Sequence, residues 1–137
     1  MQSFLSECVG IKRLKAVTAD GTTAAVSASV DLQAEKADGV LFLSSFQTPA
    51  ADNILKAQVS DDDSTFTDVS GGTVAPGASD ETQFADVLSP SKRYARASCA
   101  RGTSTVLGDI YALLYRLRQQ PYDNTTAGTI AGVAVQG

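Results

Sequence analysis

The alternation of apolar and polar residues with a period of two restricts the fold of this chain more than any other feature. Val26, Ala28 and Val30 alternate with polar neighbours, and residues 55–60 repeat the pattern as Leu-Lys-Ala-Gln-Val-Ser. Turn-forming pairs recur between such runs at residues 20–21, 38–39, 71–72, 76–77, 89–90, 101–102 and 108–109. Short half-buried strands separated by frequent turns are typical of a β-sandwich or a β-barrel. We therefore expect an all-β fold.

Two runs are apolar at consecutive positions: "VLFLSSF" at residues 40–46 and "IYALLYRL" at residues 110–117. Ile, two Tyr and the preceding Gly-Asp favour a strand over a helix in the second run. Apolar residues on both faces predict strands that are covered on two sides. The chain has 137 residues, with five Phe, four Tyr and no Trp. One domain is therefore expected, with a core packed mainly by small and β-branched side chains.

The run "QVSDDDSTFTDVSGG" at residues 58–72 raises the question of a metal site. A calcium loop of the EF-hand type needs a glycine at its sixth position and a glutamate at its twelfth. Counted from Asp61, those positions hold Phe66 and Gly72, and the next two registers fail as well. We predict instead two strands joined by a polar turn at residues 61–65, where Asp and Ser side chains bond nearby backbone amides.

Motifs that carry chemistry are scarce. The chain has no histidine, so the commonest general base and metal ligand are missing. It contains neither a Gly-x-Ser-x-Gly turn nor a glycine-rich phosphate loop. Its neighbouring carboxylates, such as Asp80 and Glu81, fall in turn-like stretches where solvated groups keep ordinary pKa values. We therefore expect no catalytic, cofactor-binding or metal-binding residues, and an enzyme is the least favoured class.

Charge is distributed unevenly along the chain. Residues 61–90 hold seven acids and no bases, whereas residues 91–120 hold six bases and one acid. Consecutive elements often lie side by side, so one interpretation is mutual neutralisation on a single surface. The other is a surface of two signs that orients a partner protein by complementary charge. The sequence leaves both interpretations open.

The basic run "SPSKRYARASCARG" at residues 89–102 has some features of a strand that binds nucleic acid. One face of an extended chain, from Arg93 to Arg101, is small and apolar in its middle and charged at its two ends. The net charge of −4 and the single aromatic residue of the run argue against a strand that follows phosphates. We interpret the run as a core strand with solvated ends and expect no nucleic-acid partner.

The two cysteines lie in different contexts. Cys99 belongs to an apolar, small-residue strand and is expected to be a buried free thiol, whereas the state of Cys8 is left open. The first seventeen residues contain Glu7 and then three cations, without an uninterrupted apolar segment. They do not have the pattern of a secretory signal, and no run is long enough to span a bilayer. We expect a soluble product made in the cytosol, with no membrane partner.

The last stretch, "YDNTTAGTIAGVAVQG", occupies residues 122–137 after Pro121 and has Asp123 as its single charged residue. The spacing of its apolar residues suits an added edge strand, and fully extended it would span about 50 Å. A frayed terminus is the alternative. The apolar content favours an arm that becomes ordered on assembly. The candidate interface residues are Tyr122, Ile130, Val133 and Val135. We divide the chain into a lead-in (1–10), a β-sandwich domain (11–121) and a C-terminal arm (122–137).

Three segments together resemble small head-associated proteins of tailed bacteriophages, including the capsid decoration or cement proteins. They are "DGVLFLSSF" (residues 38–46), "LKAQVSDDDSTFTDVSG" (55–71) and "LSPSKRYARASCARGTSTVLGDIYALLYRLRQQP" (88–121), followed by a Thr/Gly/Val tail. The order of the segments is similar to that of the family, and the resemblance covers most of residues 38–137. The N-terminal third adds little to it.

The resemblance implies a single-domain antiparallel β-sandwich of jelly-roll type, a homotrimer, and a position on the outside of an icosahedral capsid. The major capsid protein would be its partner, and the virion surface its location. The sequence leaves two other classes open. One is a carbohydrate- or receptor-binding module of a virion fibre, for which the exposed aromatic residues are few. The other is a head-completion or tail subunit, which would form rings.

Overall fold

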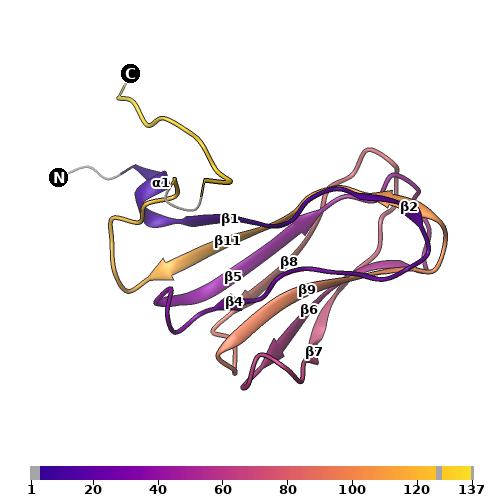
Figure 1. The fold of residues 1–137 in the computed structure, drawn as a ribbon, viewed down its shortest axis with the longest axis horizontal. Coiled ribbons are helices and arrows are strands. Elements are labelled where there is room, and N and C mark those ends of the chain that lie inside the picture. The colour runs from indigo at the N-terminus through magenta and orange to yellow at the C-terminus, as the bar shows by residue number, and fades with distance from the viewer. Residues whose placement is uncertain (1–3, 126–127, 137) are drawn as a thin grey trace.

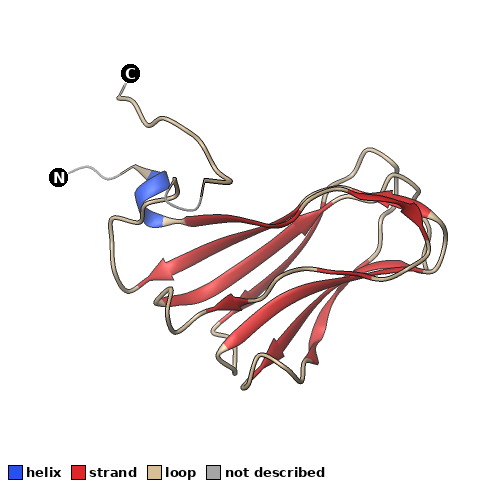
Figure 2. Cartoon of the chain, viewed as in Figure 1, coloured by secondary structure: helices blue, strands red, loops and turns tan. Residues whose placement is uncertain are grey.

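The structure, a computed structural model, describes residues 4–125 and 128–136 and is a sandwich of two antiparallel sheets (Figures 1 and 2). Sheet I has the spatial order β1 (Gly10–Lys15), β11 (Ile110–Leu117), β5 (Ala37–Ser44) and β8 (Gln83–Leu88). Sheet II has the order β9 (Tyr94–Arg101), β6 (Asn53–Ser60) and β7 (Thr67–Val74), with the short strands β3 (Ala25–Val26) and β4 (Val30–Asp31) both paired to the free side of β9. A ribbon of β2 (Thr18–Gly21) and β10 (Thr105–Leu107) closes one end.

The strand order is that of a jelly roll. Residues 10–31 run antiparallel to residues 94–117, first as β1 with β11, then as β2 with β10, and finally as β3 and β4 with β9. This paired ribbon passes from sheet I to sheet II, and the remaining strands β5 to β8 complete both sheets. The predicted all-β antiparallel sandwich of jelly-roll type is confirmed.

The described residues contain one helix, α1 (Leu5–Cys8), of four residues. It precedes β1 and lies beside the C-terminal arm (Figure 1). Among residues 4–125 and 128–136, no helix is long and apolar enough to cross a membrane.

Small side chains fill much of the space between the sheets, as the composition predicts. Seven of the buried core residues are alanines, which allow the two layers to approach closely: Ala25, Ala37, Ala57, Ala85, Ala95, Ala97 and Ala112. Phe42, Phe46, Leu55 and Leu114 are completely buried among them. Each such large side chain stabilises the fold by about 1.5–3 kcal/mol relative to an exposed one. Cys99 is also completely buried and is a free thiol, as expected.

Arg101 ends β9 inside the corner formed by the closing ribbon, and only 5% of its surface is exposed. Its Nε donates to Thr23 O at 2.6 Å, and its Nη1 donates to Ala19 O at 2.6 Å and to Thr105 O at 2.8 Å. The interpretation of Arg101 as a solvated strand end is therefore wrong. The guanidinium satisfies carbonyls that the chain leaves unpaired where it turns between the sheets.

The aspartate-rich turn between β6 and β7 has the predicted form. Asp62 Oδ1 accepts hydrogen bonds from the Ser60 hydroxyl at 2.8 Å and from the amides of Ser64 and Thr65 at 3.0 and 2.9 Å. These bonds lower the pKa of Asp62 to about 2, with the Thr65 amide as the largest cause. Asp63 adopts a left-handed conformation, with φ of 59°, which Asp tolerates better than most residues. The aspartates turn the chain.

The runs at residues 40–46 and 110–117 form strands, but only one face of each is fully buried. Val40, Phe42 and Leu114 point into the core, whereas Leu41 and Leu113 on the opposite face are half-buried. No second layer from the described part of the chain covers that face of sheet I. The prediction that these strands are covered on two sides is therefore wrong for the single chain.

Candidate functional site

Two surfaces of the sandwich have features that the fold alone does not require. One is the outer face of sheet I, and the other is the place where the C-terminal arm leaves the domain, which we call the arm root (Tyr122–Thr125). Within residues 4–125 and 128–136, no group of three or more acids and cysteines lies close enough together to hold a metal ion.

The outer face of sheet I carries apolar side chains in register across its strands. Leu113 on β11 lies opposite Leu41 on β5, and in the next row Tyr111, Leu43 and Phe84 are neighbours across three strands. Phe84 on β8 exposes 61% of its surface and Leu88, two rows away, exposes 57%. These side chains lie on one face of a four-stranded antiparallel sheet, where Asp86 is the acidic residue between Phe84 and Leu88 on β8. We call this face of sheet I the apolar face.

A glycine and a tyrosine shape one end of the apolar face. A Cβ atom at Gly39 on β5 would overlap the ring of Tyr115, its neighbour on β11, so only glycine leaves room for the ring to lie flat on the sheet. The Tyr115 hydroxyl donates to Asp86 Oδ1 on β8 at 2.5 Å. Burial, followed by this hydrogen bond, raises the pKa of Tyr115 to about 12. The phenol therefore stays neutral and fixed at physiological pH.

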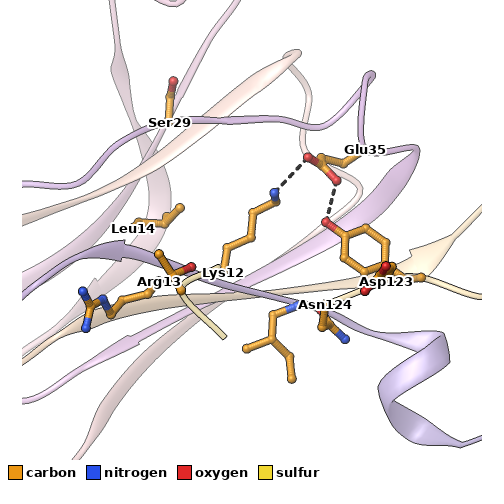
Figure 3. Close-up of a pocket in the computed structure, with 10 residues that line it drawn as sticks. Lys12, Arg13, Leu14, Ser29, Glu35, Asp123 and Asn124 are labelled. Carbon is orange, nitrogen blue, oxygen red and sulfur yellow. Dashed lines mark hydrogen bonds and ion pairs between the residues drawn. The ribbon is translucent and has the colours of Figure 1, made fainter. Parts of the chain in front are cut away.

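The arm root is held to the domain by a network around Glu35, which lies in the connection between β4 and β5 (Figure 3). Glu35 Oε1 forms an ion pair with Lys12 Nζ at 3.0 Å. Its Oε2 accepts the hydroxyl of Tyr122 at 2.7 Å. One carboxylate thus joins the edge strand β1, the β4–β5 connection and the first residue of the arm.

The electrostatics of this network favour contacts that persist at neutral pH. Partial burial acts to lower the pKa of Lys12, but the hydrogen bond and charge of Glu35 outweigh it, and the net pKa is raised. Burial and the same carboxylate raise the pKa of the Tyr122 hydroxyl. The amine therefore stays charged and the phenol stays protonated at neutral pH, so neither group is poised to exchange protons.

Asn124 fixes the next part of the arm root. Its Oδ1 accepts the Ile11 amide at 2.6 Å, and its Nδ2 donates to Val9 O at 2.9 Å and to Ser6 O at 2.7 Å. A cleft of about 540 Å³ lies beside these bonds, between β1 on one side and Ser29 and Glu35 on the other. No sequence pattern indicated this role, because an asparagine three residues after Pro121 has the pattern of an ordinary turn residue.

The four predicted interface residues have different positions. Tyr122 is half-buried and packs against the core. Tyr122, Ile130 and Val133 line a second cleft of about 310 Å³, which α1 borders through Ser6 and Glu7. Val133 exposes 86% of its surface and Val135 exposes 74%, and Val135 does not line that cleft. Residues 128–136 form no strand in the single chain, so their role as an interface stays a prediction. Residues 126, 127 and 137 of the predicted arm lie outside the described residues.

The acidic and basic segments do not neutralise one another to any large extent. In the described part of the chain, one ion pair joins them, between Lys92 and Asp61 at 3.6 Å. The physical reason is the topology, since β6 separates β7 from β9 within sheet II and β8 belongs to sheet I.

The cations of the basic run have partners inside sheet II or at its ends. Arg93 makes a two-pronged contact with Asp31, at 2.9 and 2.7 Å. Arg96 stacks on Phe66, with 3.9 Å between the guanidinium carbon and the ring centre. With Arg101 buried in its corner and Lys92 beside Asp61, each of the four cations has an intramolecular contact.

Comparison with known proteins agrees with the fold. The structure is similar to the crystal structure of the PBSX exported protein XepA, with a TM-score of 0.60 and 20% sequence identity. The match covers 98% of this chain and 46% of XepA, so the chain spans less than half of the length of that protein. No family model and no curated protein sequence matches the chain. At this level of identity, the likeness establishes a shared β-sandwich fold.

Proposed function

We propose that the chain is a non-enzymatic structural protein of a bacteriophage virion, which decorates the outside of the capsid as a homotrimer and bridges major capsid proteins. The observation that carries this proposal is the apolar face of sheet I. Soluble proteins rarely expose a broad contiguous apolar surface unless it binds another macromolecule. A flat sheet with side chains fixed by strand pairing suits a protein partner better than a small ligand, which needs a concave site.

The assignment to a virion rests on the sequence motifs within residues 38–137 that resemble those of phage head-associated proteins. The jelly-roll topology is compatible with this assignment, and the fold similarity to the PBSX exported protein supports it at the level of fold. The arm root supplies a second contact region next to the sheet. A rigid domain with two protein-binding regions can bridge neighbouring subunits of a shell.

Such a protein stabilises a capsid by mass action. Because each copy binds the assembled lattice and not the separated subunits, binding shifts the equilibrium towards the intact shell. No chemical step is required, and the stabilisation grows with the free concentration of the decorating protein. The melting temperature of the capsid should therefore rise with added protein until the sites are filled.

The test is cosedimentation of the purified chain with empty mature capsids of the phage that encodes it, together with the melting temperature of those capsids. The variant Phe84→Ser with Leu88→Ser removes two exposed anchors of the apolar face. Loss of burial of two such side chains should weaken binding by at least about tenfold. Val17→Ser is the matched control, because Val17 is 60% exposed and lies outside sheet I.

Unchanged binding of the Phe84→Ser, Leu88→Ser protein would show that the apolar face is not the capsid contact. A chain that binds glycans on an array and leaves capsids unaffected would instead be a carbohydrate-binding module. A chain that assembles into rings and binds only heads without tails would be a head-completion subunit. Either result would replace the proposed function.

A further inference from the structure

β1 is an edge strand of sheet I, so one side of its backbone has no neighbouring strand, although Leu14 O near its end accepts the Ala28 amide at 3.3 Å. At one point of this open side, the carboxamide of Asn124 occupies the place of a backbone amide. It accepts from Ile11 N and donates to Val9 O, two groups that an additional antiparallel strand would bind through two different residues. A side chain of the protein therefore already occupies this part of the open side.

The next backbone hydrogen-bonding groups on the free side of β1 are open. Residues of an antiparallel strand alternate between those whose backbone groups face the partner and those whose groups face away. The Ile11 amide faces away from β11, and the pairing register is unbroken from Ile11 to Arg13. Ile11 O and Arg13 N therefore point to the same open side, and neither has a hydrogen-bond partner among residues 4–125 and 128–136. The cleft of about 540 Å³ lies against this stretch.

We propose that this open edge binds the C-terminal arm of a second copy of the chain as an added antiparallel strand, in the mode known as β-augmentation. The segment concerned is residues 128–136 of the second copy, which we call the donated segment. This inference rests on the proposed function, since it identifies the contact that joins copies of the protein on the capsid.

The composition and length of the donated segment fit the open edge. It has no charged side chain and includes Ile130, Val133 and Val135. Fully extended, nine residues span about 30 Å, more than the length of the six-residue strand β1. Val133 and Val135 share one face of an extended chain and are largely exposed in the single chain. Pairing would bury the side chains of Val133 and Val135, which are largely exposed in the single chain.

The arm of the same copy lies near this edge, since its Thr129 lines the cleft of about 540 Å³, but its root runs in the wrong direction for antiparallel pairing. Its Tyr122 amide donates to Glu7 O at 2.9 Å and its Asn124 bonds to Val9 and Ile11, so the arm root runs parallel to β1. All strand pairs within residues 4–125 and 128–136 are antiparallel, and parallel pairing is slightly weaker. Residues 130–134 then border the second cleft beside α1. A second copy can approach the edge in the antiparallel direction.

The first test uses backbone chemistry at Arg13. Arg13→Pro removes the open N–H without removing any hydrogen bond within sheet I, because proline is tolerated on the free side of an edge strand. Arg13→Ala is the matched control, since it removes the same side chain and keeps the N–H. Analytical ultracentrifugation of the full chain should show oligomers for the native protein and for Arg13→Ala. Arg13→Pro should raise the dissociation constant by about tenfold or more.

A second test does not depend on proline being tolerated. Two proteins are prepared in a Cys8→Ser background, one with Arg13→Cys and the other with Val133→Cys, and are mixed under mild oxidation. A disulfide between the two different chains is expected, and Val17→Cys in place of Arg13→Cys should give none. A native protein that stays monomeric at high micromolar concentration, or the absence of the mixed disulfide, would overturn the inference.

The outcome of these oligomerisation tests can be distinguished from the outcome of the capsid-binding test. A chain that oligomerises through the arm but does not cosediment with capsids keeps this inference and loses the capsid role. A chain that binds capsids as an arm-independent monomer keeps the capsid role and overturns this inference.

Discussion

The carboxamide of Asn124 closes part of the open edge of β1, where its Oδ1 accepts the Ile11 amide at 2.6 Å across 113 residues of sequence. Its Nδ2 makes two further bonds, to Val9 O and Ser6 O. A single side chain therefore joins the lead-in, the first strand and the arm.

Asn124→Ala is expected to loosen the arm root without unfolding the sandwich. The substitution removes three hydrogen bonds at a partly buried site, and the free energy of unfolding should fall by about 1–3 kcal/mol. Amide hydrogen exchange of Ile11 should become faster, because its acceptor is lost. Exchange measured by NMR on the native and variant proteins reports this directly.

Asn124→Asp is the informative companion variant. The carboxylate keeps an acceptor for Ile11 N but loses both donors to Val9 O and Ser6 O. Protection of the Ile11 amide should therefore survive, while the stability falls. Equal protection of Ile11 in the native and Asn124→Ala proteins would contradict the role given to this side chain.

Arg101→Met is expected to be the most destabilising of the substitutions discussed. The variant keeps an apolar stem but leaves Ala19 O, Thr23 O and Thr105 O without their donor in a buried corner. Unsatisfied buried groups cost about 1–3 kcal/mol each, so a loss of at least about 3 kcal/mol is expected in urea unfolding. Arg118→Ala serves as control, because Arg118 is exposed and its ion pair with Asp38 spans 3.7 Å. If Arg101→Met lowers the free energy of unfolding no more than the control does, the hydrogen bonds of Arg101 do not stabilise this corner.

The two cysteines should differ in reactivity. Burial is the main cause that raises the pKa of Cys99 to about 12, and the thiol is completely covered. Because the thiolate is the reactive form, a thiol reagent at pH 8 should modify the half-buried Cys8 and leave Cys99 intact. A Cys8→Ser protein should then show no rapid modification until urea unfolds it. Rapid modification of native Cys8→Ser protein would mean that the core opens readily.

The sequence predicted those parts of the fold that local patterns determine. The strand at residues 110–117, the strands on either side of the aspartate turn and the bonds of the turn itself depend on nearby residues. Alternation gives each strand and its buried face, and the turn bonds of Asp62 span no more than three residues. The buried state of Cys99 follows from the same alternation.

What the sequence did not predict depends on which strands become neighbours. Arg101 looks like a polar strand end, and its burial results from the β2–β10 ribbon that folds over it. The apolar outer residues Leu41 and Leu113 have the pattern of a strand covered twice, although no layer from the described part of the chain covers them. The pattern at these residues, which suggested a buried sheet, fits equally well with a face that a partner covers.

The last prediction concerns acid stability and the pair Asp31–Arg93. The hydrogen bonds of Arg93 are the largest cause that lowers the pKa of Asp31 to about 2, and the amides of Ala34 and Gln33 add to them. In the unfolded chain the pKa of an aspartate is about 4. Since the folded state holds this proton less tightly, the stabilisation is complete above pH of about 4 and is lost as the pH falls towards about 2.

Asp31→Asn removes the titrating group, so the urea midpoint of the variant should fall less steeply than that of the native protein between about pH 4 and about pH 2. Arg93→Gln should flatten the same interval, because it removes the largest cause of the low pKa while keeping the carboxyl. Above pH 5 the difference between native and Asp31→Asn proteins should be constant, since both pKa values of Asp31 lie well below that range. If neither substitution changes the fall of the urea midpoint at acid pH, the Asp31–Arg93 contact contributes nothing to that fall. Other carboxylates then determine the acid stability of this fold.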